Sequence, residues 1–179
     1  MKTQLGLTTV ALTLLLAFCS GCATPAQPMA MVPASATVAR KYTGSVVLSS
    51  QGGLPTNPMN MSDISNEDFT TAVVSSLDKF GLFSSVVRAG DGDYRLDVRL
   101  LKLNRPMFGG FDMCVSMETY WKLIRTSDGK VLFAESVHSS YTATVSDALV
   151  GIVRLRLASE GSARENIKSA VERLSRVAP

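Results

Sequence analysis

The sequence has few of the side chains on which catalysis and metal binding most often depend. Its 179 residues include one histidine, His138, and three cysteines, Cys19, Cys22 and Cys114. One histidine and so few thiols do not supply the four ligands of a zinc site. A hydrolytic triad needs a nucleophile held beside a base, and no serine lies in a G-x-S-x-G motif. We therefore expect a protein that is not an enzyme and that holds no metal or cofactor.

The sequence also lacks a strong charge of either sign. It has 18 Lys and Arg against 15 Asp and Glu, with one of the basic residues at Lys2. Nucleic-acid-binding domains carry a marked basic excess on one face. A nucleic acid is therefore excluded as the expected partner.

The N-terminus carries an apolar run over residues 5–18, followed by Cys19-Ser20-Gly21-Cys22-Ala23. This run is shorter than the ~20 apolar residues that span a bilayer as a helix. A basic start, a short apolar core and small residues before a cysteine resemble the signal peptide and lipobox of bacterial lipoproteins. The small Ser20 and Gly21 favour Cys22 as the modified residue. The alternatives are modification of Cys19, a plain secretory signal, or a membrane helix.

The lipoprotein resemblance implies cleavage before Cys22 and acylation of its thiol. Two or three acyl chains would anchor the protein permanently in a membrane. Because Ala23 rather than an aspartate follows the cysteine, the resemblance implies the outer membrane, with the protein facing the periplasm. Cys114 then has no cysteine to pair with, and we expect it to be a buried or half-buried side chain of a strand.

The sequence divides into three segments by composition. Residues 1–21 form the lipoprotein signal peptide. Residues 22–40 are rich in Ala, Pro, Met and Thr and have no acidic residue, which predicts a flexible tether. Residues 41–179 are long enough for a single domain with its own core.

Hydrophobic periodicity predicts an α+β domain. Ser65 and Gly81 delimit an amphipathic helix, and a capping box at Ser162 and Glu165 begins the last helix after a kink or break close to Gly161. The expected strands, by alternation and turn residues, cover residues 42–49, 84–88, 94–103, 113–125 and 131–145. Residues 149–157 fit either a helix or a strand. We expect an antiparallel sheet of about four or five strands with two helices packed on one face, and Trp121 in the core.

Two surface features are candidates for binding. The loop over residues 105–111 carries Met107, Phe108 and Phe111, which either cover the edge of the core or form a docking surface for a partner. Alternation places Tyr120 and Ile124 on the face opposite Trp121. If the helices cover the Trp121 face, these two residues lie on an open sheet face.

The stretches over residues 80–86 and 94–98, together with the lipobox, resemble the small accessory lipoproteins of the Gram-negative envelope. The resemblance covers residues 65–177 and rests on pattern rather than on a diagnostic motif. It implies a membrane-anchored, non-enzymatic accessory protein that binds an envelope protein in assembly or transport. Two alternatives stay open. One is a periplasmic carrier of a lipid or other apolar ligand, and the other is a cell-wall hydrolase or its activator, with His138 beside a carboxylate.

Overall fold

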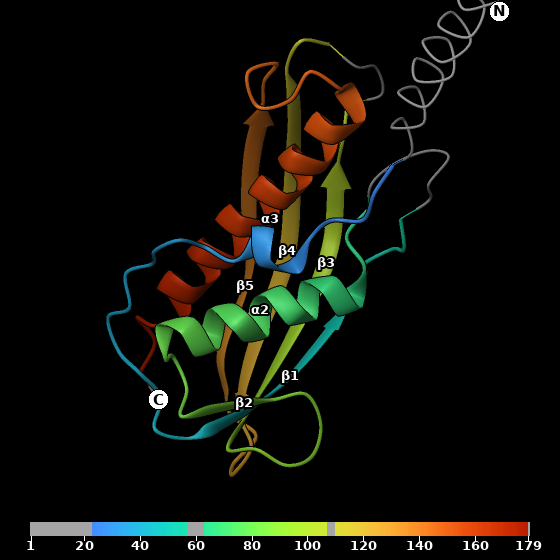
Figure 1. Ribbon diagram of the computed structural model, residues 1–179. Helices are drawn as coiled ribbons and strands as arrows, with labels where there is room; N and C mark the ends of the chain where they lie inside the picture. The colour runs from blue at the N-terminus through green and yellow to red at the C-terminus, as the bar shows by residue number, and fades with distance from the viewer. Residues whose placement is uncertain (1–22, 57–62, 107–109, 179) are drawn as a thin grey trace, which may run out of the picture.

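A computed structural model describes residues 23–56, 63–106 and 110–178 (Figure 1). Within these ranges the chain forms five strands, two α-helices and one short 3-10 helix. In order they are η2 (Pro28–Met31), β1 (Ser45–Gln51), α2 (Asn66–Phe80), β2 (Ser85–Val87), β3 (Tyr94–Asn104), β4 (Met113–Arg125), β5 (Val131–Ala143) and α3 (Gly151–Leu174). The predicted α+β class is confirmed.

The strands form one sheet in the order β2-β1-β3-β4-β5. β3, β4 and β5 are the predicted antiparallel meander, in which Val98 faces Trp121 and Trp121 faces Glu135. β1, however, runs parallel to both of its neighbours, with Leu48 opposite Leu96. The sheet is therefore mixed rather than wholly antiparallel. The physical reason is that α2 joins β1 to β2, and a helical crossover returns the chain in the same direction.

Both α-helices cover the same face of the sheet, as predicted (Figure 1). α3 lies over β4 and β5, whereas α2 lies over β1 and β2. Large side chains fill the space between the layers and are fully buried, among them Trp121, Phe69, Leu96 and Ile167. Trp121 also donates from Nε1 to the Thr119 hydroxyl at 2.7 Å. Its predicted place in the core is confirmed.

α2 begins and ends where the sequence predicts. The Ser65 hydroxyl accepts a hydrogen bond from the Asp68 amide at 3.0 Å, which caps the first turn. Gly81 adopts a left-handed φ of 57° and donates its amide to the carbonyls of Leu77 and Asp78. Glycine takes up this conformation without the steric penalty of a side chain.

α3 is one continuous helix of 24 residues, so the predicted break at Gly161, the capping box at Ser162 and the strand option for residues 149–157 are wrong. The break was expected because Glu160 and Arg164 would lie beside the apolar stripe. Both instead bond to the N-terminal segment: Glu160 accepts from the Gln27 amide at 2.8 Å, and Arg164 donates to the Ala30 carbonyl at 2.9 Å. Neither α3 nor another helix in the described ranges is long and apolar enough to cross a membrane.

Residues 23–40 are part of the folded domain, so the prediction of a flexible tether is wrong for them. Ala23, Ala26 and Met31 are buried, and η2 lies between α2 and α3 (Figure 1). Lys79 of α2 donates to the Pro33 carbonyl at 2.7 Å. The two helices touch little, and the small and flexible apolar side chains of the segment fill the groove between them. The composition of residues 22–40 predicted a linker, because composition alone cannot show that the fold leaves a groove between the helices for this segment to fill.

Candidate functional site

The sheet face turned away from the helices carries mostly polar side chains, and we call it the open face. Strand register and alternation place on it side chains from β1, β3, β4 and β5. Among them are Val47, Ser49, Gln51, Arg95, Asp97, Arg99, Lys102, Cys114, Glu118, Tyr120, Lys122, Ile124, Ser136 and His138. Four of these are basic and two are acidic, so the open face has a positive excess.

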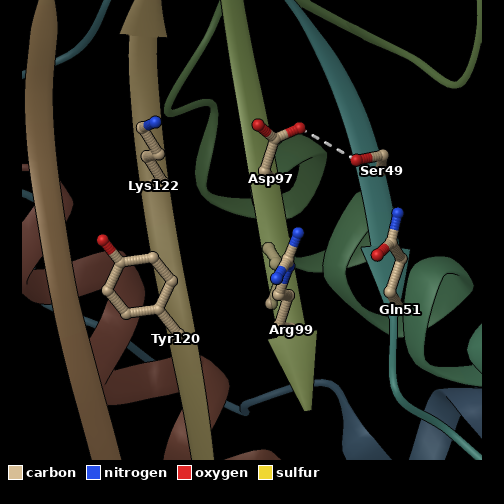
Figure 2. A pocket seen from close by; sticks show the side chains of 7 residues that line it. Ser49, Gln51, Asp97, Arg99, Tyr120 and Lys122 are labelled. Carbon is tan, nitrogen blue, oxygen red and sulfur yellow. Dashed lines mark hydrogen bonds between the residues drawn. The ribbon is translucent and has the colours of Figure 1, made fainter. Parts of the chain in front are cut away.

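The centre of the open face is a shallow depression of about 340 Å³. Figure 2 shows its side chains rising from three neighbouring strands, with Arg99 of β3 next to Tyr120 of β4, and Lys122 of β4 next to Asp97 of β3. The Ser49 hydroxyl donates to Asp97 at 3.0 Å (Figure 2), and Arg95 Nε lies 3.3 Å from the same carboxylate. Asp97 is thus already paired and also stands opposite the half-buried Lys122, whereas Arg99 is exposed. The lining is far more polar than that of a usual pocket for an apolar small molecule.

The two residues predicted to share this face have different environments. Tyr120 is half-buried and stands opposite Ser136, with its ring edge in the depression. Ile124 is buried at the end of β4 beside Val47 and Val131, which line a neighbouring hollow. Tyr120 is therefore the more accessible of the two side chains.

His138 lies on the open face opposite Glu118, with 3.8 Å between its Nε2 and the Glu118 carboxylate. The imidazole is 70 % exposed and projects from the middle of a strand. A general base works best where water is excluded and a nucleophile is held beside it. This exposed cross-strand pair offers neither condition, so it gives no support to the hydrolase alternative.

Cys114 is exposed on β4 opposite Thr142, so the prediction that it is buried or half-buried is wrong. β4 begins at Met113, and the helices do not cover the open face where Cys114 lies. Within the described ranges, no three His, Cys, Asp or Glu side chains come together in a way that could hold a metal ion.

The predicted binding loop is described only in part. Met107 and Phe108 lie outside the described residues, as does the proposed lipidation site Cys22. Phe111 is 82 % exposed and does not cover the edge of the core. The interpretation that the loop covers the core edge is therefore wrong for Phe111, and the docking surface stays a prediction.

Sequence reasoning missed two buried charged groups of α3. Burial raises the pKa of the Glu160 carboxyl, and the Gln27 amide with the nearby Arg156 and Arg164 partly offsets that rise. Arg154 is also buried, and its guanidinium donates to the carbonyls of Ala148, Leu149 and Gly110 at 2.8–3.0 Å. Charge alone gives no sign of such partners, and two of them, the Gln27 amide and the Gly110 carbonyl, are distant in the sequence.

The interior gives no support to a carrier of apolar ligands. Side chains with essentially no exposure fill the layer between helices and sheet, including Leu77, Leu123 and Leu174. The polar groups of this layer bond to each other: Thr119 donates to Asn166, and Asn166 donates to the Val137 carbonyl at 2.9 Å. Among the described residues, this close packing leaves no room for a bound lipid between helices and sheet.

Comparisons with known proteins identify the fold but not a family. No family model matches the chain, and no curated protein matches it. A Xanthomonas campestris protein of the family DUF330 is similar in structure, with a TM-score of 0.56 and 17 % identity over 83 % of this chain and 95 % of that one. A minor lipoprotein from Acinetobacter baumannii has a TM-score of 0.50 and 9 % identity over 74 % and 94 % of the two chains. At these identities the likeness concerns the fold alone.

Proposed function

We propose that the protein is a membrane-anchored, non-enzymatic accessory lipoprotein of the bacterial cell envelope, attached through Cys22 to the outer membrane and facing the periplasm, where it binds a protein partner. The observation that carries the proposal is the open face: a broad, uncovered, polar sheet surface on a domain that is otherwise close-packed. The lipobox supports the anchor. The A. baumannii lipoprotein of the same fold supports the class of protein.

The composition of the open face favours a protein partner with an acidic surface. Arg99 and Lys122 flank Tyr120 in the central depression, and Arg95 and Lys102 extend the basic surface along β3. Arginine and tyrosine are over-represented among the residues that contribute most to protein interfaces. Opposite charge on the partner would raise the rate of encounter and fix the orientation of docking.

A crosslinking experiment in intact cells tests the proposal. A photoreactive residue at position 120 should crosslink one envelope protein, whereas the same residue at the exposed Glu165 on α3 should not. Arg99→Glu with Lys122→Glu should abolish that crosslink and the complementation of a deletion strain, because the changes reverse the charge of the depression. The matched control reverses Lys168 and Arg176 on the helix side and should preserve both.

The non-enzymatic role is tested in the same strain. His138→Ala and Cys114→Ser should each complement the deletion, since neither side chain has the setting of a base or a nucleophile. Immunoblots confirm that the variants are as abundant as the wild type. Loss of function in a folded and abundant His138→Ala variant would refute the non-enzymatic role. Unchanged crosslinking after charge reversal would refute the open face as the binding surface.

A further inference from the structure

The N-terminal segment is held tightly against the domain from its first described residue. Ala23 is only 5 % exposed. The next residue, Thr24, accepts a hydrogen bond from Arg156 of α3 at 2.9 Å, and Gln27 is bonded to Glu160 one turn further along the same helix. The chain therefore enters the domain beside the N-terminal part of α3.

This attachment fixes the distance between the domain and the proposed anchor. Consecutive Cα atoms are about 3.8 Å apart, so an acylated Cys22 lies one residue away from the packed Ala23. With residues 23–40 packed on the domain, no slack chain separates the domain from the membrane. This step rests on the proposed lipid anchor at Cys22.

The same end of the domain exposes large apolar side chains. Phe111 lies in the connection between β3 and β4, and Leu149 and Val150 directly precede α3. They are 82 %, 89 % and 46 % exposed. In Figure 1 the described part of the β3–β4 connection, the β5–α3 connection and the start of α3 lie together at the upper end of the molecule. Exposed apolar side chains gathered in this way mark a surface that meets a partner or a membrane.

A buried arginine holds these two loops together. The Arg154 guanidinium donates to the Ala148 and Leu149 carbonyls in the β5–α3 connection and to the Gly110 carbonyl in the β3–β4 connection. Removing a guanidinium from water is unfavourable unless hydrogen bonds compensate for it. These bonds therefore hold the backbone at Leu149 and at Gly110, the residue before Phe111.

We infer that this end of the domain lies against the lipid bilayer, with Phe111, Leu149 and Val150 inserted among the lipid headgroups and upper acyl chains. Aromatic and aliphatic side chains at this depth bury apolar area without crossing the membrane. The exposed Asp112 and Asp147 on the same loops limit insertion to the tips of the apolar side chains. The open face then stands roughly perpendicular to the membrane and remains accessible to a periplasmic partner.

Fluorescence quenching on the full lipidated protein tests this orientation. The protein is reconstituted into vesicles of phosphatidylethanolamine and phosphatidylglycerol, in a Cys114→Ser background that removes the native exposed thiol. A fluorophore is attached at Leu149→Cys or, as the control, at Val131→Cys. Val131 is also an exposed apolar residue, but it begins β5, whose 13 residues place it roughly 40 Å away at the opposite end.

We expect spin-labelled lipid to quench the fluorophore at position 149 and to leave the one at position 131 unquenched, with a blue shift of emission only at 149. Flotation of the vesicles separates a failure of the proposed lipid anchor from a failure of the proposed orientation of the domain. Protein that fails to float refutes the anchor. Protein that floats but leaves position 149 open to aqueous iodide refutes the orientation. Protection at 149 in native membranes but not in protein-free vesicles would also overturn it, because a protein would then cover this end. Phe111→Asp should reduce lipid quenching at 149 while flotation is retained.

Discussion

Gly161 gives the sharpest test of how α3 packs on the sheet. In the interior of a helix, replacing glycine by alanine ordinarily stabilises a protein by about 0.5–1 kcal/mol, because alanine loses less conformational entropy on folding. At this position, however, an added Cβ would come closer than 3.0 Å to three carbon atoms of the Tyr141 ring. Rotation of the ring about its own Cβ–Cγ bond cannot relieve this contact, because Cγ is one of the three atoms and stays in place.

The two effects oppose each other, and their magnitudes decide the sign. Forcing an extra carbon atom into a close-packed contact costs about 1–3 kcal/mol. We therefore expect Gly161→Ala to lower the free energy of unfolding by about 1–2 kcal/mol after the gain in helix propensity is subtracted. For a domain of this size, 1 kcal/mol corresponds to a fall in Tm of roughly 2–4 °C.

Urea denaturation followed by circular dichroism measures the change, with two matched comparisons. Gly151→Ala in the same helix should be neutral or slightly stabilising, because its Cβ would meet Met113 and Arg154 only at 3.6 and 3.7 Å. In a Tyr141→Ala background, Gly161→Ala should become stabilising, since the ring that it strikes is gone. A Gly161→Ala protein more stable than the wild type would refute the packing of Tyr141 against this turn of α3.

Three further predictions concern the segment and the core. Met31→Ala should lower the free energy of unfolding by about 2–5 kcal/mol, because Met31 is fully buried between the helices. Met29→Ala should change it little, because that side chain is 68 % exposed. Equal effects of the two substitutions would show that residues 23–40 are a flexible tether after all. Burial raises the pKa of Glu160 above its value in the unfolded chain, so the charged carboxylate destabilises the folded state. This destabilisation is absent at pH values below the pKa of the unfolded chain and grows as pH rises through the pKa of the folded chain. The stability of the wild type relative to Glu160→Gln should therefore fall between pH 4 and pH 7 in urea titrations, and a rise would contradict the burial. Trp121→Ala should cost about 3–5 kcal/mol, and a native emission maximum near that of free tryptophan would show that the side chain is not buried.

Local sequence patterns predicted the features that depend on near neighbours. Ser65 and Gly81 delimit α2 because capping and the left-handed turn involve residues only a few positions away. The change of alternation at Leu100 and Leu101 corresponds to a register shift between β3 and β4, and Leu101 is exposed there. The side of the sheet that the helices cover also follows from alternation, since Trp121 and Tyr120 cannot share a face.

Features that depend on distant contacts could not be predicted in the same way. The parallel pairing of β1 depends on where α2 returns the chain, and the pattern of β1 does not encode its neighbours. The polar residues of α3 suggested a break, but Glu160 and Arg164 are satisfied by backbone groups 130 residues or more away. The open face was anticipated only through Tyr120 and Ile124. Its basic character emerges when register brings Arg99 beside Tyr120.

The most direct test of the central claim is mass spectrometry of the mature N-terminus of protein purified from membranes. Trypsin should release one N-terminal peptide that covers residues 22–40, because Arg40 is the first basic residue after Cys22. The account predicts that this peptide begins at Cys22 and carries the mass of a diacylglyceryl group, and that Cys22→Ser abolishes the modification. A mature chain that begins elsewhere, or an unmodified Cys22 at its start, would contradict the lipid anchor.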